Sequence, residues 1–551
     1  MILRWFFLGF AAAVTSLFGT VATATICPSV PPAQRTTFIS AEAYATSAGF
    51  SLRDDGILLF DYGKAFDGLG KWADPYFNSN YALALYRDYL QTDCKDDEVR
   101  QKFLRVADWM IAEGKQRGEM LVWEYPFSDP NFRLDPGWIS GIGQSRIAGV
   151  LVRAHAMSAD KKYKKAASAA MAAYEHSIAE GGVMTFDGDV AWLEEMADPK
   201  GNSFKVLNGH ITGLAGIMDY YTVTHEQKWQ DLIQKAVAAV KRDVHLFDAG
   251  FSSYYSLKMP SNDRPIAPRL EYNAGHVGQL IWMCEQFGDS EFLRWAMRFH
   301  AYDANQDRYT ASSSIDPVAH GPEGVKALYG DHYWSSGVFP AVLTVDLPAI
   351  DRVRGLAIDA NLMDERPLNF NVTAWKNGVK VAESSIKDNH LRHIDVIFDK
   401  PVDADRVVAT FLDTSGKDIL AIKALMVLRD IPHYGAAMNE CNATFRRIIP
   451  HPILGDVPGS PVRPRCDGWV ILPREYAEGT LKIEAADDGE GQFTVSYSDD
   501  LEKWVPAGEI PASGGELSIA EGKFVRLAFQ VTIGTTNKIW LSASALHTAQ
   551  R

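Results

Sequence analysis

The stretch from residue 206 to residue 218 runs Val-Leu-Asn-Gly-His-Ile-Thr-Gly-Leu-Ala-Gly-Ile-Met. Its apolar residues recur at intervals of three and four, which places them on one face of an α-helix. The same spacing appears in other groups of residues in the first half of the chain: Ile139, Ile142, Ile147, Val150, Leu151 and Ala154; Trp229, Leu232, Ile233 and Val240; Val277, Leu280, Ile281 and Cys284. We therefore expect residues 71–310 to form an α/α toroid, an incomplete helical barrel with its unusual polar residues on the loops.

The pattern changes on both sides of this region. Residues 25–70 are expected to form an N-terminal extended segment. After about residue 340, apolar and polar residues alternate, as in Phe493-Thr494-Val495-Ser496-Tyr497, which is typical of half-buried strands. Two β-sandwich modules are predicted, at 340–430 and 466–548, with a Pro-rich connector at 431–465 between them. The predicted fold class is multidomain α+β: an α/α toroid followed by two β-sandwich modules.

The N-terminus and the overall charge limit where the chain works and what it binds. Residues 1–24 carry an apolar run after Arg4 and end in Ala22-Thr23-Ala24, which predicts a signal peptide and a secreted or periplasmic protein; an uncleaved membrane anchor is the alternative. A net charge of -14 argues against nucleic acid as a partner. There are five cysteines, so at least one is unpaired; Cys441 and Cys466 are a candidate pair, and Cys284 is a candidate buried thiol.

Unusual polar residues gather in two segments. The first is Trp192-Leu193-Glu194-Glu195-Met196, followed by Asn208-Gly209. The second holds Tyr255-Ser256-Leu257-Lys258 and then Tyr272 and His276. A carboxylate and two phenols are the groups needed to move a proton on a carbon acid. The alternatives are structural: the glutamates as loop caps, the tyrosines as packed aromatics, Asn208 as a helix N-cap and His276 as a satisfied helix-start histidine.

Four ordered blocks within these segments resemble the C-terminal domain of the D-glucuronyl C5-epimerases, enzymes that convert glucuronate to iduronate in polysaccharide chains. The blocks are Pro136-Gly137-Trp138-Ile139-Ser140-Gly141-Ile142-Gly143-Gln144 with Leu151-Val152-Arg153-Ala154; Trp192-Leu193-Glu194-Glu195 with Val206-Leu207-Asn208-Gly209; Phe247-Asp248-Ala249-Gly250 with Tyr255-Ser256-Leu257-Lys258; and Leu270-Glu271-Tyr272-Asn273 with His276. The resemblance covers less than half of the chain. It does not account for the C-terminal β-modules.

The resemblance implies which residues carry the chemistry. The carboxylate and two tyrosines implicated in C5 proton exchange in the family match Glu195, Tyr255 and Tyr272. Two positions depart from the family pattern: Met196 replaces a tyrosine, and Lys258 replaces an arginine, which removes a bidentate fork suited to a carboxylate.

Removal of the C5 hydrogen of a uronate builds negative charge on its carboxylate, and inversion needs a proton donor on the opposite face of the ring. We expect Glu195 to be the base, Tyr272 the acid, and Tyr255 or Lys258 the group that holds the substrate carboxylate. Further candidates for substrate contact are Gln144, Arg146 as a carboxylate clamp, His276, Trp138 as a stacking face, Glu194 and Asn208.

The sequence therefore predicts C5 epimerisation of a uronate residue in an acidic polysaccharide or oligosaccharide, by an enzyme without cofactor or metal. A homodimer is one expected form. Two alternatives stay open: a polysaccharide lyase, which starts with the same proton abstraction, and a non-catalytic glycan-binding protein. The second β-module favours carbohydrate binding in each case, because Tyr497-Ser498-Asp499-Asp500-Leu501-Glu502-Lys503-Trp504 resembles the strand and turn of galactose-binding-like modules.

Overall fold

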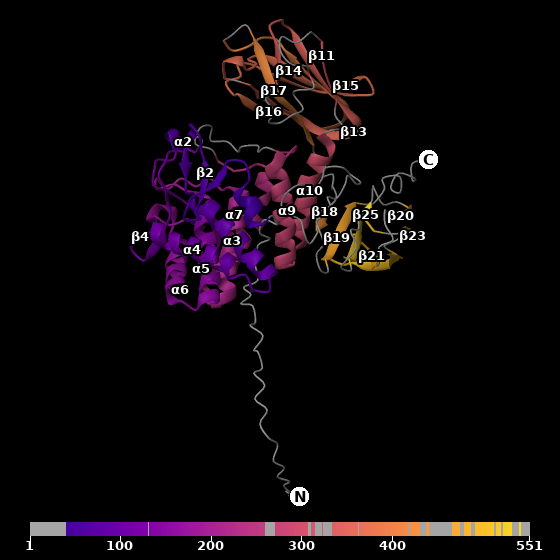
Figure 1. Ribbon diagram of the computed structural model, residues 1–551. Helices are drawn as coiled ribbons and strands as arrows, with labels where there is room; N and C mark the ends of the chain where they lie inside the picture. Colours follow the sequence, from indigo (N-terminus) through magenta and orange to yellow (C-terminus); the bar gives the residue numbers. More distant parts are fainter. Residues whose placement is uncertain are drawn as a thin grey trace, which may run out of the picture.

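The computed structural model combines helices in the first half of the chain with β-sheets in the second (Figure 1). It describes residues 40–129, 132–258, 270–306, 310–314, 322, 333–361, 363–416, 419–429, 437–439, 466–473, 479–485, 491–511, 514–519, 522–531 and 539–540. The predicted signal peptide, residues 25–39 and most of the predicted connector lie outside this range. Among the helices that are described, none is both long and apolar enough to cross a membrane.

Several helices of the helical domain, residues 40–306, begin at polar caps. Side chains of Asp74, Asp96, Ser140 and Asp160 accept backbone N–H groups at the starts of α3, α4, α5 and α6. The helices are α1 (Ala41–Ala45), α2 (Ala65–Gly68), α3 (Pro75–Gln91), α4 (Asp97–Glu113), α5 (Gly141–Ser158), α6 (Lys161–Met171), α7 (Leu207–Thr224), α8 (Gln227–Asp243), α9 (Leu270–Phe287) and α10 (Ser290–Gln306).

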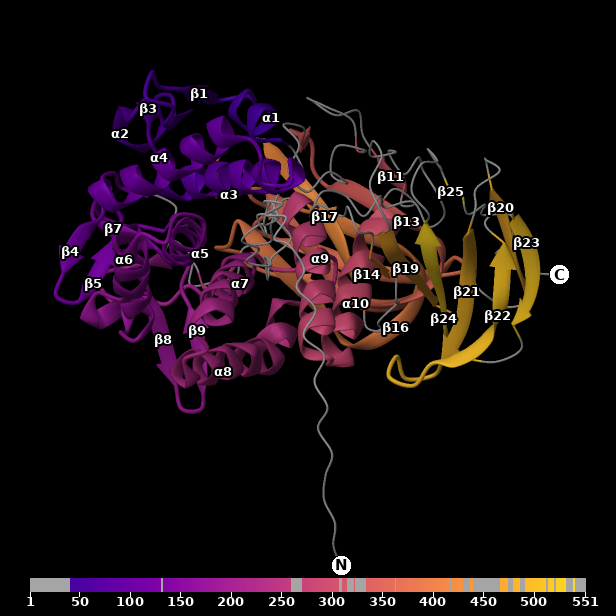
Figure 2. The same cartoon turned by 60° about the horizontal axis from the view of Figure 1, so that its bottom comes forward.

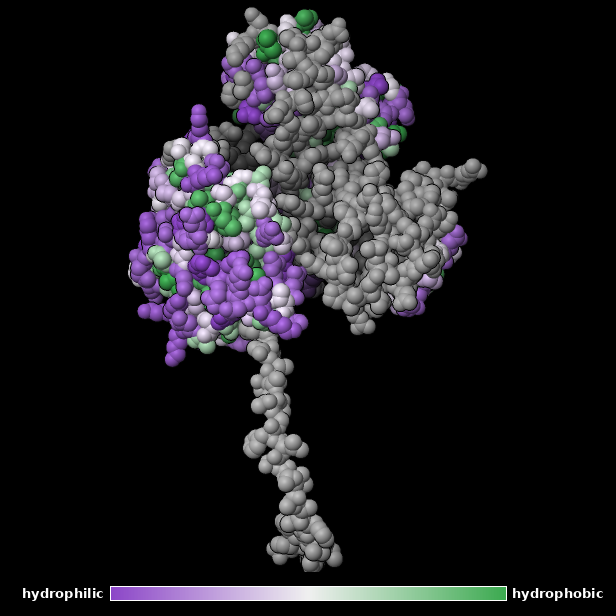
Figure 3. Space-filling view, viewed as in Figure 1, coloured by the Kyte–Doolittle hydropathy of each residue, from purple (hydrophilic) through white to green (hydrophobic). Residues whose placement is uncertain are grey.

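Successive helices of this domain pack in pairs. Helix α3 packs on α4, α5 packs on α6 and α7, α7 packs on α8, and α9 packs on α10. Their apolar faces meet in the main core, which explains the three-and-four spacing in the sequence. The mixture of helices and sheets is as expected, whereas the toroid stays a prediction. Hydrophilic residues cover much of the face of this domain shown in Figure 3, with an apolar patch among them.

Short strands connect the helices and carry most of the polar residues discussed below. Residues 50–72 form the sheet β1 (Phe50–Leu52), β2 (Leu58–Asp61) and β3 (Lys71–Trp72), so the predicted extended segment is partly strand and partly the helices α1 and α2. The others are β4 (Lys115–Arg117) with β5 (Met120–Val122), β8 (Met184–Asp187) with β9 (Val190–Leu193), and β10 (Met196–Ala197) with β7 (Trp138–Ser140) and β6 (Glu124–Tyr125).

The first β-domain, residues 310–429, is one seven-stranded sheet that bends along its two longest strands. Its strands are β11 (Thr310–Ser313), β12 (Trp334–Ser336), β13 (Ala341–Ala360), β14 (Phe370–Lys376), β15 (Val379–Ile386), β16 (His393–Phe411) and β17 (Leu420–Arg429). Register shifts after Asp346 and Val353 divide β13, which pairs with β11 before the first shift and with β17 from Val353 onward. Both halves bury side chains in one apolar cluster, as in a sandwich whose strands pass between layers.

The C-terminal β-domain contains two sheets. One has β18 (Ala437–Asn439), β19 (Cys466–Pro473), β24 (Phe524–Val531), β21 (Gly491–Ser498) and β22 (Val505–Pro511); the other has β23 (Gly514–Ile519), β20 (Gly479–Ala485) and β25 (Ile539–Trp540). This domain does not stand apart from the helices. Ile471, Leu501 and Phe524 belong to the main core, and Trp469 and Trp504 pack against it. Figures 1 and 2 both show β19 beside α9 and α10.

Candidate active site

The adjacent carboxylates Glu194 and Glu195 point to opposite sides of the chain. They join β9 to β10, and the backbone is held on both sides: Glu194 N–H donates to Val183 O at 2.9 Å, and Gly141 N–H donates to Glu195 O at 3.0 Å. Successive side chains of an extended chain alternate between its two faces. One carboxylate is therefore turned into the protein, and the other is turned toward the start of α7.

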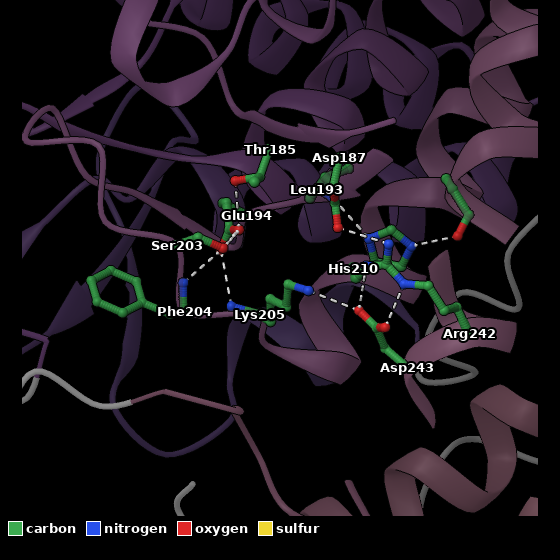
Figure 4. Close-up of polar contacts among 11 residues, drawn as sticks. Thr185, Asp187, Leu193, Glu194, Ser203, Phe204, Lys205, His210, Arg242 and Asp243 are labelled. Carbon is green, nitrogen blue, oxygen red and sulfur yellow. Dashed lines mark hydrogen bonds and ion pairs between the residues drawn. The ribbon is translucent and has the colours of Figure 1, made fainter. Parts of the chain in front are cut away.

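Glu194 is a structural residue. Its buried carboxylate accepts four hydrogen bonds: from the hydroxyls of Thr185, at 2.9 Å, and Ser203, and from the backbone N–H groups of Phe204 and Lys205, at 3.0 and 3.1 Å (Figure 4). Burial raises its pKa, and these donors oppose the rise. The side chain thus shapes the loop before α7, and its contact with substrate stays a prediction that none of these bonds supports.

Glu195 lies against the first turn of α7. Its Oε1 accepts the Tyr255 hydroxyl at 3.1 Å, and its Oε2 lies 3.5 Å from Asn208 Nδ2. Gly209 makes this approach possible, because a Cβ at that position would collide with the carboxylate. Burial raises the pKa of Glu195 to about 7; the hydrogen bond from Tyr255 acts against this rise, and the charge of Asp129 adds to it. Such a carboxyl exchanges protons near neutral pH.

The two candidate tyrosines meet beside this carboxylate. Their rings pack edge to face, with centroids 4.7 Å apart and planes at 70°. Tyr255 is half-buried, and its pKa is well above its usual value because of burial, the charge of Glu195 and the proximity of Tyr272. Tyr272, at the start of α9, is 38% exposed. Glu195, Tyr255 and Tyr272 thus come together from three distant segments, as expected.

Backbone pairing explains why these segments converge. An antiparallel bridge joins Val206 to Ser256, and Leu207 N–H donates to Tyr255 O at 3.0 Å. Beyond the bridge, Lys258 N–H donates to Phe204 O at 3.2 Å. The segment that carries Tyr255 therefore runs beside the segment that leads into α7, and the exposed Lys258 lies at its end.

Three other expected substrate contacts are buried and engaged elsewhere. Gln144 is 1% exposed and donates to the carbonyl groups of Leu121 and Ala170. His276 is fully buried, its Nδ1 lies 2.7 Å from Ser253 Oγ, and burial lowers its pKa to about 3. The ring of Trp138 stacks on the ring of Tyr125, with their centroids 4.1 Å apart. The structure does not bring these three side chains to Glu195, and their contact with substrate stays a prediction.

Arg146 is also turned toward protein. Its guanidinium lies 5.8 Å from the ring centroid of the half-buried Tyr76 on α3. Among the described residues, Arg146 makes no contact with Glu195, Tyr255 or Tyr272. The structure therefore gives no support to its expected role as a carboxylate clamp. Asn208, by contrast, is at the site, on the first turn of α7 beside Glu195.

Two residues that lie near the site were not predicted from the sequence. Asp129 raises the pKa of both Glu195 and Tyr255 through its charge, and its own carboxylate accepts Phe132 N–H at 3.3 Å. Gln279 donates to Asn208 O at 2.9 Å and to Thr212 Oγ1 at 3.0 Å, which ties α9 to α7. Gln279 follows Tyr272 by seven residues, or two helical turns, so both lie on the same face of α9. That spacing is the feature of the sequence that could have predicted its position near the site. Asp129 has no comparable signal.

No group of three metal-ligating side chains occurs among the described residues. The polar groups that the structure brings together here are the Glu195 carboxyl group, the phenols of Tyr255 and Tyr272, and the Asn208 amide.

Comparison with known proteins agrees with the four sequence blocks. Residues 116–301 match the family model described as D-glucuronyl C5-epimerase C-terminus, which confirms the resemblance. The D-glucuronyl C5-epimerase of Caenorhabditis elegans is 29% identical over 218 residues, 36% of this chain and 34% of that protein. An uncharacterised protein of Methanocaldococcus jannaschii is 23% identical over 243 residues, 41% of this chain and 76% of that protein. The match thus spans about a third of the nematode enzyme.

Solved structures of carbohydrate-binding modules are also similar to part of the chain. A family 32 module from C. perfringens NanJ in complex with galactose is 25% identical, with a TM-score of 0.21, and covers 22% of this chain and 96% of that one. A family 32 module from Streptococcus pneumoniae EndoD is 17% identical, with a TM-score of 0.20 and the same coverage. At these TM-scores the likeness carries no weight for fold or function.

Proposed function

Because residues 116–301 belong to the family of D-glucuronyl C5-epimerase C-terminal domains, we propose that this chain epimerises C5 of a uronate residue in an acidic polysaccharide. The observation that carries the proposal is the convergence of Glu195, Tyr255 and Tyr272 from three segments. The disulfide-bonded Cys94 supports action outside the cytosol, in a secreted or periplasmic setting. A homodimer stays a prediction.

In the proposed reaction, the ionised Glu195 carboxylate takes the C5 proton. The electron pair left on C5 delocalises onto the substrate carboxylate as an enolate, and Asn208 and Lys258 stabilise that charge. The Tyr272 hydroxyl then donates a proton to the opposite face of C5. The phenolate regains a proton from solvent, and the Glu195 carboxyl group releases the proton taken from C5 to solvent. Tyr255 holds the Glu195 carboxylate in place through its hydrogen bond. The net change is inversion at C5 with exchange of one proton.

One observation favours a polysaccharide lyase as the second candidate. The Tyr255 hydroxyl donates directly to Glu195, so a base and a phenolic acid lie next to each other and could act together on one face of a sugar. Elimination across C4 and C5 with both groups on one face needs such an arrangement. The carboxylate would take the C5 proton, and the phenol would protonate the departing C4 oxygen.

The test is incubation of the protein with a panel of uronate polysaccharides in heavy water. An epimerase introduces deuterium at C5 and leaves the polymer intact. A lyase produces chain ends with an unsaturated, ultraviolet-absorbing uronate, and a non-catalytic binder produces neither change. The absence of both changes with every uronan would refute the proposal.

The variant Glu195→Gln keeps the shape of the side chain but removes the base. We expect the rate of deuterium incorporation to fall by about 10²–10⁴-fold, because general base help from one positioned group is of this size. The matched control is Glu113→Gln, at an exposed position at the end of α4, with an unchanged rate. Full exchange by Glu195→Gln would remove Glu195 from the mechanism.

A further inference from the structure

A loop joins the first β-domain to the active site. We call residues 248–258 the tyrosine loop, because it carries Tyr255. It begins with a tight turn in which Asp248 and Ser253 form a bridge and Gly250 adopts a φ of 80°. At the tip of this turn, Ala249 and Phe251 are buried in a small apolar cluster with Ala357, Ala424, Met426 and Leu428, residues of β13 and β17.

The fit at the tip of the turn is close. A Cβ on Gly250 would lie 2.9 Å from Arg354 Nη2 and 3.4 Å from Leu428 Cδ2. The backbone also crosses the boundary, because Arg429 N–H donates to Gly250 O at 3.4 Å. The positive φ favours glycine at this position, and any larger residue would have to push the Arg354 guanidinium aside. The β-domain therefore holds the tip of the tyrosine loop through side-chain packing and through the backbone.

The base of the turn is anchored to α10. The Asp248 carboxylate accepts Arg298 Nε at 2.7 Å, the Tyr302 hydroxyl at 2.5 Å and Gly250 N–H at 2.9 Å. Arg298 and Asp248 also form an ion pair in which both side chains are largely buried. Three bonds on one carboxylate fix the direction in which the loop leaves the helical domain.

The outgoing half of the loop is bonded to the elements of the active site. Ser253 N–H donates to Asn273 Oδ1 at 2.9 Å, directly after Tyr272 on α9. Two residues further on, Tyr255 enters the pairing with the segment before α7. Only Tyr254 separates Ser253 from Tyr255, so the turn held by the β-domain lies directly before the segment that places Tyr255 beside Glu195.

We propose that the first β-domain positions the active site, with Phe251 and Gly250 as the positioning residues that transmit its packing to Tyr255. The expected effect on the reaction rate rests on the proposed function. The contacts between the β-domain and the tyrosine loop do not depend on which reaction the site catalyses. Positioning of Tyr255 gives the first β-domain a role in catalysis. Phe251 does not touch the reacting groups and acts through the loop.

The test compares two leucines of the same domain. Leu428→Ala removes packing from the tip of the tyrosine loop, whereas Leu343→Ala makes the same change in the core of the β-domain, away from the loop. Hydrogen exchange of residues 252–258 is measured first, because it needs no turnover. We expect faster exchange in this segment for Leu428→Ala and for Phe251→Ala, wild-type exchange for Leu343→Ala, and recovery in the conservative variant Phe251→Leu.

The second measurement is the pH profile of deuterium incorporation. The groups that face Glu195 are Tyr255 and Asp129, and the bond from Tyr255 lowers the pKa of the carboxyl. If Phe251→Ala displaces Tyr255, kcat should fall about tenfold or more with little change in KM, and the acidic limb should move to higher pH. Leu343→Ala should not move that limb.

Equal exchange in residues 252–258 for all four variants would overturn the positioning role, whatever the enzyme's activity. Altered exchange together with a wild-type protein that acts on no uronan would keep the coupling and refute the proposed function. Altered exchange in an active enzyme with an unchanged pH profile and unchanged kcat would also overturn the positioning role, because the loop would then move without affecting catalysis.

Discussion

The difference between Glu194 and Glu195 shows how one position along an extended chain decides the role of a carboxylate. Glu194 meets four donors and is part of the architecture. Burial raises the pKa of both carboxyl groups, but Glu195 meets only one phenol and, more distantly, one amide, and its pKa rises to about 7. A carboxylate saturated with donors is a poor base, whereas one with a raised pKa near neutrality can accept and return a proton.

The sign of each neighbour's effect on Glu195 gives a pH prediction. Activity requires the ionised carboxylate, so the rate should rise with pH through about 7. Asp129 raises that pKa, and Asp129→Asn should therefore move the acidic limb to lower pH. Tyr255 lowers it, and Tyr255→Phe should move the limb of the residual activity to higher pH. The check is the pH profile of C5 deuterium exchange; shifts of both variants in the same direction would contradict this account.

At the scale of elements, the start of α7 is shaped to receive a carboxylate. Its third residue is Gly209, although alanine is the better helix former by about 1 kcal/mol. The loss of helix propensity at this position is explained by Glu195, whose side chain occupies the space that a Cβ on residue 209 would take. Helix α5 offers a comparison, because the atoms nearest to a Cβ added at its third residue, Gly143, belong to Ser140 and Tyr76 and lie 3.4 Å or more away.

Gly209→Ala should therefore separate stability from activity. The helix gains propensity, but the new methyl group displaces the Glu195 carboxylate from Tyr255, and we expect kcat to fall by about 10²-fold. Gly143→Ala, at the equivalent position of α5, should leave the rate within about twofold of wild type. Thermal unfolding and deuterium exchange check both variants. A fully active Gly209→Ala protein would show that the carboxylate is not held where the structure places it.

At the scale of the whole molecule, the C-terminal β-domain docks on α9 and α10 through its aromatic residues. The Arg526 guanidinium lies 5.7 Å from the ring of Trp469 and 5.8 Å from that of Trp504, and both rings pack against the main core. Around them, Arg294 donates to Asp500 O at 2.7 Å and pairs with Glu502 at 3.5 Å. The predicted galactose-binding-like turn at 497–504 therefore faces the helices.

The free energies of these interactions indicate which of them holds the C-terminal β-domain in place. The Arg294–Glu502 pair is largely exposed, and such pairs contribute about 0–1 kcal/mol, whereas burial of a large aromatic side chain contributes about 1.5–3 kcal/mol or more. Trp504→Ala should therefore loosen the domain, and Arg294→Ala should barely do so. The radius of gyration from solution scattering should rise only for Trp504→Ala. A larger effect of Arg294→Ala would show that charge holds the domain in place.

The sequence by itself determined that helices fill the first half of the chain and strands the second, and it pointed to three residues that meet at the site. Periods of three to four and of two depend on neighbouring residues alone, so helices such as α7 and strands such as β21 could be predicted. The blocks around Glu195, Tyr255 and Tyr272 were also visible, and the structure brings all three together.

Only the tertiary structure decided which polar side chains reach that site. Gln144 and His276 belong to the same blocks, yet packing against Leu121 and Ser253 buries them. Asp129, Gln279 and Phe251 gain their roles from segments far away in the chain. The physical reason is that burial, pKa and positioning depend on contacts between distant segments, which no local pattern records, whereas periodicity is set within a few residues.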